Sequence, residues 1–281
     1  MKKGKSVMTA LRGTTKQNEY ITLYNKLHEI IMEKAKKYFQ DIADGKVKDN
    51  YTSQATAQQY LRNNFIPFMS CIHVIKEENY FVYSILGKFY EINNFRNSLM
   101  HDNKLVEIFE PTDLAISILE DTIDKLTNPM KVREFLQVTN KYGAETIDLK
   151  TPIIELFSKI EEFKYTQFPV FDNEKFKGLI SDNGIAYWIV NAAIEEKDFQ
   201  SVELSDVTVS DVLVHEEKNT AYKVIRADSY LHDALKHFSI SEEHSTSPIL
   251  LVTEDGDVSS RNSIMGVLTG YDYLEISNYA L

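Results

Sequence analysis

The chain has 281 residues, of which 43% are hydrophobic and 26% are charged, as is ordinary for a soluble globular protein of one or two domains. It contains no apolar run of the roughly 18 residues that a membrane helix needs, and its basic N-terminus lacks the apolar segment of a secretory signal. The only cysteine, Cys71, excludes an intrachain disulfide framework and is typical of a reducing compartment, so we expect a cytoplasmic protein with a buried, unreactive thiol.

The net charge of −11 is unevenly distributed along the chain. Residues 1–130 carry a net charge of +1, whereas residues 131–281 carry −12. A polyanion such as RNA would therefore meet less repulsion at the N-terminal half. A small anionic ligand can still bind to the acidic half through backbone N–H groups.

The N-terminal half has apolar residues at three- and four-residue spacing, which is typical of amphipathic helices. Thr14 or Thr15 can cap the first helix, Ser53 can cap the second, and Pro111 opens the fourth. Pro67 lies inside the second helix, where we expect a kink or a break. The pattern predicts a bundle of four or five helices, with the main segments at residues 14–44, 53–75, 78–100 and 111–128.

Near the end of the third predicted helix, Arg96 and His101 stand five residues apart, about 140° around a helix. An imidazole can transfer protons near neutral pH, and a guanidinium can hold a phosphate by two hydrogen bonds. The pair is therefore a candidate site for metal-independent RNA cleavage, with His101 as general acid and base and Arg96 stabilising the transition state. The structural alternative is that both cations stabilise the helix dipole near the C-terminal end of the helix.

The motif Arg96-Asn-Ser-Leu-Met-His101 resembles the R-x4-6-H signature of HEPN domains, with Asn97 as the polar residue that commonly follows the arginine. Outside the motif, the resemblance over about residues 10–128 is one of architecture. It implies an all-helical HEPN-like domain at residues 1–128, often dimeric and in many members a metal-independent endoribonuclease. Arg96, Asn97 and His101 would then be catalytic, and RNA would be the substrate. Position 103 is Asn, so the variant with a modified tyrosine two residues after the histidine is not supported.

The C-terminal half contains an internal repeat with a period of about 77 residues. Each copy has a similar lead-in, Val132-Arg-Glu-Phe-Leu136 and Val209-Ser-Asp-Val-Leu213, before its first strand. The third strand of each copy has a related end, Gly178-Leu-Ile-Ser181 and Gly266-Val-Leu-Thr269. We expect the order β-α-β-β-α twice, with copy one at about residues 129–200 and copy two at about residues 205–281.

This repeat resembles a tandem pair of CBS domains, the regulatory module of the cystathionine-β-synthase type. The lead-ins, the strand ends and the strands Phe168-Pro-Val-Phe-Asp172 and Pro248-Ile-Leu-Leu-Val252 carry the resemblance. It implies an α+β protein, in which the helical bundle precedes a CBS pair at residues 129–281. Such pairs have two clefts that usually bind an adenosine ligand, namely AMP, ADP, ATP, S-adenosylmethionine or cyclic di-AMP. The ligand would be regulatory, and no cofactor is required.

Thr269 and Asp272 form the complete T-x-x-D turn of copy two. Asp272 can accept two hydrogen bonds from a ribose diol, and the N-terminus of the following helix favours phosphate. A structural alternative is that Thr269 only caps this helix. Copy one reads Ser181-Asp-Asn-Gly184, with a glycine in place of the ribose-binding carboxylate. We therefore expect the first cleft to bind a nucleoside poorly, or through other groups.

The CBS resemblance also implies that adenine lies against the backbone at Ala221-Tyr222 and Ser247-Pro248. Tyr222 could stack on the base, and Arg226 is a candidate phosphate partner. The structural alternative is that Arg226 is simply an exposed arginine at a strand end, without a ligand. The histidines of copy two lack metal-ligand spacing, so no metal site is predicted.

Two functions are open. In the first, the CBS pair senses an adenine nucleotide and regulates a HEPN-like endoribonuclease. In the second, the protein is a non-enzymatic nucleotide receptor whose helical domain mediates dimerisation or partner binding. A structural CBS scaffold without ligand is a third alternative. Both resemblances imply a homodimer, and no membrane partner is expected.

Overall fold

The computed structural model describes residues 14–101, 110–195, 204–216, 222–238 and 249–281. The chain forms two compact units, Met1–Pro129 together with Leu281, and Met130–Ala280. The first unit is helical and the second is mixed α/β, so the predicted helix-rich N-terminal region and α/β C-terminal region are confirmed. Within the described ranges, no helix is long and apolar enough to cross a membrane.

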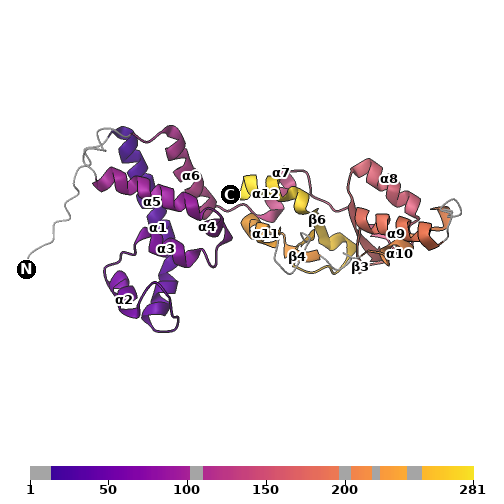
Figure 1. Ribbon diagram of the computed structural model, residues 1–281, viewed down its shortest axis with the longest axis horizontal. Helices are drawn as coiled ribbons and strands as arrows, with labels where there is room; N and C mark the ends of the chain where they lie inside the picture. The colour runs from indigo at the N-terminus through magenta and orange to yellow at the C-terminus, as the bar shows by residue number, and fades with distance from the viewer. Residues whose placement is uncertain (1–13, 102–109, 196–203, 217–221, 239–248) are drawn as a thin grey trace, which may run out of the picture. The chain divides into compact units, whose positions relative to one another are not determined.

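The helical unit is built around one long helix (Figure 1). Thr14 accepts a hydrogen bond from the backbone N–H of Gln17, and Ser53 accepts one from Thr56, so both predicted caps are present. The helices of this unit are α1 (Thr15–Ala43), α2 (Gln54–Arg62), α3 (Phe68–Ile75), α4 (Tyr80–Ser84), α5 (Leu86–His101) and α6 (Asp113–Thr127).

Two predicted helices are interrupted. The second ends at Arg62 and resumes at Phe68, directly after Pro67, because proline lacks the N–H that a continuous helix would use. The third is divided at Ile85, whose φ of −108° and ψ of 23° are not helical. Apart from these interruptions, the helices follow the apolar periodicity of the sequence.

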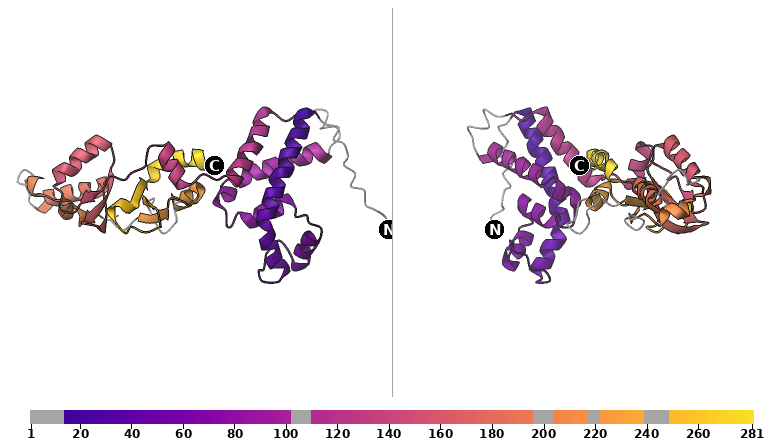
Figure 2. Two further views of the ribbon diagram at one scale, coloured as in Figure 1. Left: turned by 180° about the vertical axis from the view of Figure 1, so that it is seen from behind. Right: turned by 45° about the vertical axis from the view of Figure 1, so that its right-hand side comes forward.

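The core of the helical unit lies along α1, which runs beside α3, α5 and α6 (Figure 2). Leu27, Ile31 and Phe39 of α1 are fully buried, and each such side chain stabilises the fold by about 1.5–3 kcal/mol. Cys71 is buried in the same core, as predicted, and burial raises the pKa of its thiol to about 12. The thiol is therefore protonated at neutral pH and is a poor nucleophile.

The α/β unit contains two three-stranded sheets, β1-β2-β3 and β4-β5-β6. In each sheet the first pair of strands is parallel and the second pair is antiparallel. Copy one comprises α7 (Val132–Val138), β1 (Ile147–Asp148), α8 (Ile153–Phe163), β2 (Gln167–Asp172), β3 (Lys175–Ser181) and α9 (Asp182–Glu195), followed by a 3₁₀ turn, η2 (Leu204–Asp206). Copy two comprises α10 (Val209–Leu213), β4 (Tyr222–Arg226), α11 (Leu231–Phe238), β5 (Ile249–Thr253), η3 (Arg261–Ser263), β6 (Ile264–Leu268), η4 (Gly270–Asp272) and α12 (Tyr273–Ala280).

The lead-in helix of each copy, α7 or α10, packs against the other copy, so that the two copies exchange their lead-in helices. In α7, the backbone N–H of Val132 donates to Ser229 of copy two at 3.0 Å. In α10, the N–H of Val209 donates to Thr151 of copy one at 2.8 Å. Figure 1 accordingly shows α7 beside α11 and α12, and α10 beside α9. The exchange carries the segment after each lead-in helix to the turn that follows the third strand of the other copy.

The two sheets also share a core. Phe171 and Leu179 of copy one pack in one cluster with Ile249, Leu251 and Ile264 of copy two. At the edge of this core, Arg261 donates to the carboxylate of Asp148 at 2.5 Å. The copies are therefore joined both by apolar contacts and by polar contacts between loops.

Candidate functional site

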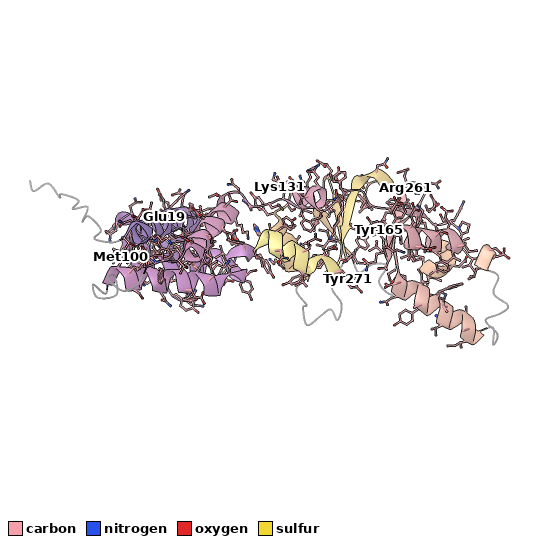
Figure 3. The ribbon with its side chains drawn as sticks, turned by 90° about the horizontal axis from the view of Figure 1, so that it is seen from above. Glu19, Met100, Lys131, Tyr165, Arg261 and Tyr271 are labelled. Atoms are coloured by element: carbon pink, nitrogen blue, oxygen red, sulfur yellow. The ribbon has the colours of Figure 1, made fainter. Side chains whose placement is uncertain are left out.

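A cleft of about 330 Å³ opens between the two copies. Copy two lines it with the end of β6 and the following turn, including Thr269 and Asp272. Copy one lines it with Lys141, residues 143–145, residues 164–167 and Asp182. Tyr165 and Tyr271, which are labelled in Figure 3, line the cleft from opposite copies. The volume is within the range of small-molecule sites.

The turn at Thr269 is held by its own side chains. One carboxylate oxygen of Asp272, Oδ2, accepts hydrogen bonds from the backbone N–H of Thr269 at 2.6 Å and from its hydroxyl at 3.1 Å. The Thr269 hydroxyl in turn accepts from the N–H of Tyr271 at 3.3 Å. Thr269 thus caps the 3₁₀ turn η4, as in the structural alternative, and it also lines the cleft. The turn fixes the orientation of the Asp272 carboxylate before any ligand binds.

The other oxygen of Asp272 is bound by Lys141. The ammonium group lies 2.6 Å from Asp272 Oδ1 and also donates to the carboxylate of Glu275. Side-chain exposure is 29% for Lys141 and 14% for Asp272, so both groups are largely removed from water. Burial lowers the pKa of Lys141, but the hydrogen bonds to Asp272 and Glu275 outweigh it and raise the pKa above its usual value. Lys141 is therefore a fixed positive charge in the half of the protein whose net charge is negative.

Gln167 lines the copy-one side of the cleft. Its side-chain oxygen is buried and has no hydrogen-bond partner within the described parts of the chain. A buried acceptor without a partner costs about 1–3 kcal/mol, and because this oxygen is not exposed to the cleft, a ligand could reach it only after the side chain changes conformation. The cleft therefore combines a carboxylate and a cation, Asp272 and Lys141.

The sequence-predicted ligand residues are only partly brought together. Thr269 and Asp272 line the cleft. Tyr222 instead packs edge-on against Phe176, with ring centroids 5.2 Å apart. Arg226 is 56% exposed and pairs with Asp228 at 2.9 Å. Ala221, Ser247 and Pro248 lie outside the described residues.

Counterparts of these residues in copy one do line the cleft. Ala144 and Glu145 stand 77 residues before Ala221 and Tyr222, one repeat period, and both are lining residues. The cleft therefore joins the T-x-x-D turn of copy two to the segments before β1 and β2 of copy one. Lys141 and Gln167 were missed by sequence reasoning because no motif marks them. Only the exchange of lead-in helices brings Lys141 to Asp272.

The turn of copy one is built differently. The carboxylate of Glu216, which follows α10, accepts from the backbone N–H of Ser181 at 2.7 Å and from its hydroxyl at 2.6 Å. Glu216 is only 5% exposed, and it lies directly against Gly184. The position of the missing aspartate is thus next to a carboxylate from another part of the chain.

In the helical unit, Arg96 and Asn97 lie on α5 and contact each other. Arg96 donates to the side-chain oxygen of Asn97 at 3.1 Å, and its guanidinium lies 5.3 Å from the ring centre of Tyr24. Its Nε is buried and has no partner within the described residues. His101 is the last residue of α5, and its side chain lies outside the described part. Whether Arg96 and His101 share a site thus stays a prediction. Across the described residues, no group of His, Cys, Asp or Glu could hold a metal ion.

Comparison with known proteins gives a family likeness in the α/β unit. Residues 133–191 match the family model of the CBS domain. Among solved structures, the CBS-domain containing protein ATU1752 from Agrobacterium tumefaciens has 17% identity, over 52% of this chain and 92% of that chain, with a TM-score of 0.36. A CBS domain-containing protein from Bacillus anthracis has 18% identity, over 54% of this chain and 95% of that chain, with a TM-score of 0.37.

A structure of CBSX2 in complex with AMP has 18% identity, over 48% of this chain and 88% of that chain, with a TM-score of 0.32. No match is found among curated proteins. The family match supports the expected CBS resemblance of the α/β unit, whereas the HEPN-like resemblance of the helical unit stays a prediction.

Proposed function

We propose that this protein senses an adenine nucleotide, which binds in the cleft between the two copies of the α/β unit. The observation that carries the proposal is the placement of Asp272 and Lys141 together in a cleft of about 330 Å³. A carboxylate can accept hydrogen bonds from ribose hydroxyls and a cation can bind a phosphate, and these two residues provide both groups.

The turn supports binding because it orients Asp272 in advance. Thr269 holds Oδ2 by two hydrogen bonds, and Oδ1 faces Lys141. A ribose diol that binds to Oδ1 would take over part of the Lys141 interaction and leave the ammonium group free to contact the phosphate. Residues 143–145 and Gln167 would then face the base from copy one.

A thermal-shift panel tests the ligand class. AMP, ADP, ATP, S-adenosylmethionine and cyclic di-AMP are each added to the full chain, with GMP and uridine monophosphate as controls. A ligand at 100 times its dissociation constant stabilises the folded protein by about 2.7 kcal/mol, which is a measurable increase in Tm. AMP is the first compound to test, since CBSX2 was solved with it. If no adenine compound raises the Tm at millimolar concentration, the proposal is wrong.

For the helical unit, we propose a HEPN-like endoribonuclease that is regulated by the nucleotide. The observation that favours this function is Arg96, whose guanidinium is held by Asn97 and Tyr24 while its Nε has no partner in the described residues. A guanidinium fixed in this way can stabilise a phosphorane-like charge, with His101 as the acid and base. In the alternative, the unit is a non-enzymatic platform for dimerisation or partner binding.

A homodimer is part of the proposal. Helix α9 exposes Tyr187, Val190 and Ile194 to solvent, and such apolar side chains favour association when they share a helix face. Size-exclusion chromatography with light scattering would measure the mass of the full chain. The substitution Val190→Glu is expected to shift a dimer toward the monomer.

A further inference from the structure

We propose that Glu216 closes the turn of copy one in place of the missing aspartate, so that the α/β unit takes one nucleotide per chain, at Asp272. The number of bound nucleotides rests on the proposed function. The closure of the turn is a property of the fold and can be tested without any ligand.

The first argument is the equivalence of the two turns. In copy two, one oxygen of Asp272 accepts from both the N–H and the hydroxyl of Thr269, at 2.6 and 3.1 Å. In copy one, one oxygen of Glu216 accepts from both the N–H and the hydroxyl of Ser181, at 2.7 and 2.6 Å. The same two donors at the end of the third strand are thus satisfied by a carboxylate in both copies. The carboxylate is local in copy two, and it comes from 35 residues further along the chain in copy one.

The second argument is steric. A Cβ added to Gly184 would lie 2.4 Å from a carboxylate oxygen of Glu216 and 3.2 Å from its Cβ. Residue 184 is where the T-x-x-D pattern has its aspartate, so an aspartate there and Glu216 cannot occupy this space together. Gly184 and Glu216 therefore form a matched pair, in which the loss of one side chain makes room for the other.

The third argument is burial. Glu216 and Ser181 are buried, whereas Asp272 is only partly buried and lines an open cleft. A ribose diol can reach a carboxylate only from the solvent side. Glu216 therefore supports the turn but is shielded from a ligand, while Asp272 does both.

The exchange of lead-in helices explains how Glu216 reaches this position. Helix α10 binds to copy one through the N–H groups of Val209 and Ser210, which donate to Thr151 and Leu149. Glu216 follows α10 by three residues and therefore meets the copy-one turn. Lys141 follows α7 in the same way and meets Asp272 of copy two. The segments after the two lead-ins thus have opposite charges. Lys141 lies at the intact turn of copy two, and Glu216 lies at the turn of copy one that lacks the aspartate.

A double-mutant cycle in the absence of ligand tests the closure. Glu216→Ala leaves the donors of Ser181 without this acceptor, and Gly184→Asp introduces a clash, so each is expected to lower the Tm of the full chain. In Gly184→Asp/Glu216→Ala the new aspartate can take over both hydrogen bonds. The decrease in Tm of the double variant is therefore expected to be smaller than the sum of the decreases of the two single variants. Strictly additive losses would overturn the proposal.

Two further variants keep the cycle informative. Gly184→Ala adds only the clashing Cβ, and it replaces Gly184→Asp if that protein does not fold. Glu161→Ala removes an exposed glutamate of α8, and it is expected to leave the Tm unchanged alone and to show no coupling with Gly184→Ala. Coupling of the same size with Glu161→Ala would contradict a specific Gly184–Glu216 pair.

Isothermal titration with AMP tests the number of sites. We expect one AMP per wild-type chain and two per chain of Gly184→Asp/Glu216→Ala, which restores the S-x-x-D pattern at residues 181–184. Two AMP molecules per wild-type chain, or one per chain of the double variant, would overturn the claim that Glu216 keeps the first turn closed. If no AMP binds to either protein, the proposed function fails for AMP, while the ligand-free cycle still decides whether Glu216 closes the turn.

Discussion

Lys141 and Asp272 are joined by an ion pair of 2.6 Å, although 131 residues separate them in the sequence. The pair forms where the segment after α7 meets the turn after β6, that is, where the exchanged lead-in of copy one reaches copy two. A ligand that binds to the Asp272 carboxylate must therefore displace or share Lys141. Such a ligand would cause a conformational change only if it bound two positions of the α7 segment with different affinities.

Replacing Lys141 is expected to separate phosphate recognition from nucleoside recognition. In Lys141→Met the apolar stem is largely retained and only the charge is lost. We expect the affinity for AMP to fall about tenfold or more, and the affinity for adenosine to change less, because only AMP has a phosphate for the cation. Isothermal titration with both ligands measures this difference, and Lys175→Met, an exposed lysine of β3, is the control. Equal losses for AMP and adenosine would show that Lys141 does not contact the phosphate.

The same substitution is expected to lower the stability of the α/β unit. Asp272 and Glu275 both lose the cation that neutralises them, and a hydrogen bond to a charged group contributes about 1.5–3 kcal/mol. Because Glu275 is partly exposed, we expect a decrease of about 1–2 kcal/mol in the free energy of unfolding. Urea denaturation followed by circular dichroism measures it. No change in the denaturation midpoint would mean that the ion pair contributes nothing to stability.

Gly266 is predicted to be required by the packing of the lead-in. A Cβ at this position would lie 2.8 Å from Leu136 and 3.0 Å from the backbone oxygen of Lys141. Gly266→Ala should therefore displace the segment that carries Lys141 and destabilise the protein by about 1–3 kcal/mol. Gly87→Ala in α5 is the control, since a Cβ there meets nothing within 4 Å and alanine favours the helix. An unchanged Tm in Gly266→Ala would mean that Leu136 and Lys141 do not pack tightly against Gly266 of β6.

The helical unit is expected to lose stability in mild acid because of His28. Burial lowers the pKa of His28 below 6.5, although a hydrogen bond to the carbonyl of Ile66 opposes this. As the pH decreases below 6.5, His28 binds a proton in the unfolded chain but not in the folded chain. The free energy of unfolding therefore decreases until the pH reaches the pKa of His28 in the folded chain. His28→Gln should show a smaller decrease in Tm between pH 7.5 and 5.5 than the wild type. An equal decrease in both proteins would exclude His28 as a cause.

RNA cleavage separates the two proposed functions of the helical unit. If the unit is a nuclease, Arg96→Ala and His101→Ala should each lower the cleavage rate by at least a hundredfold, because each removes a distinct part of the chemistry. Arg62→Ala, at the end of α2, controls for the loss of a positive charge. The assay uses a single-stranded RNA with EDTA, with and without AMP. Cleavage that survives both substitutions would contradict the assignment, and the receptor function would then be favoured.

Local sequence signals predicted the elements, and their failures are informative. Apolar periodicity and capping residues placed α1, α6 and the start of α2 closely, because these features are decided within a few residues of each helix end. The strand end Gly266-Val-Leu-Thr269 is also a local pattern, and it placed the turn at Thr269. The exchange of α7 and α10 is a contact between distant segments, so no local pattern revealed that Lys141 would meet Asp272 or that Glu216 would meet Ser181.

The predicted base contacts stay a prediction, because Ala221, Ser247 and Pro248 lie outside the described residues. The CBS resemblance implied that the base lies against Ala221-Tyr222 and Ser247-Pro248 of copy two, the copy that contains the T-x-x-D turn. In the structure, the turn shares its cleft with residues 143–145 and 164–167 of copy one. The repeat itself contained a signal, since residues 144 and 145 stand one period before 221 and 222. What the sequence lacked was the information on which copy faces which.

Isothermal titration of AMP into the wild type and into Asp272→Ala tests the central claim most directly. Asp257→Ala, which removes an exposed carboxylate outside the cleft, is the matched control for charge. We predict that Asp272→Ala weakens AMP binding at least thirtyfold, while Asp257→Ala binds like the wild type. Circular dichroism verifies that all three proteins are folded. Equal AMP affinity in the wild type and in Asp272→Ala would contradict the assignment of the cleft as the nucleotide site.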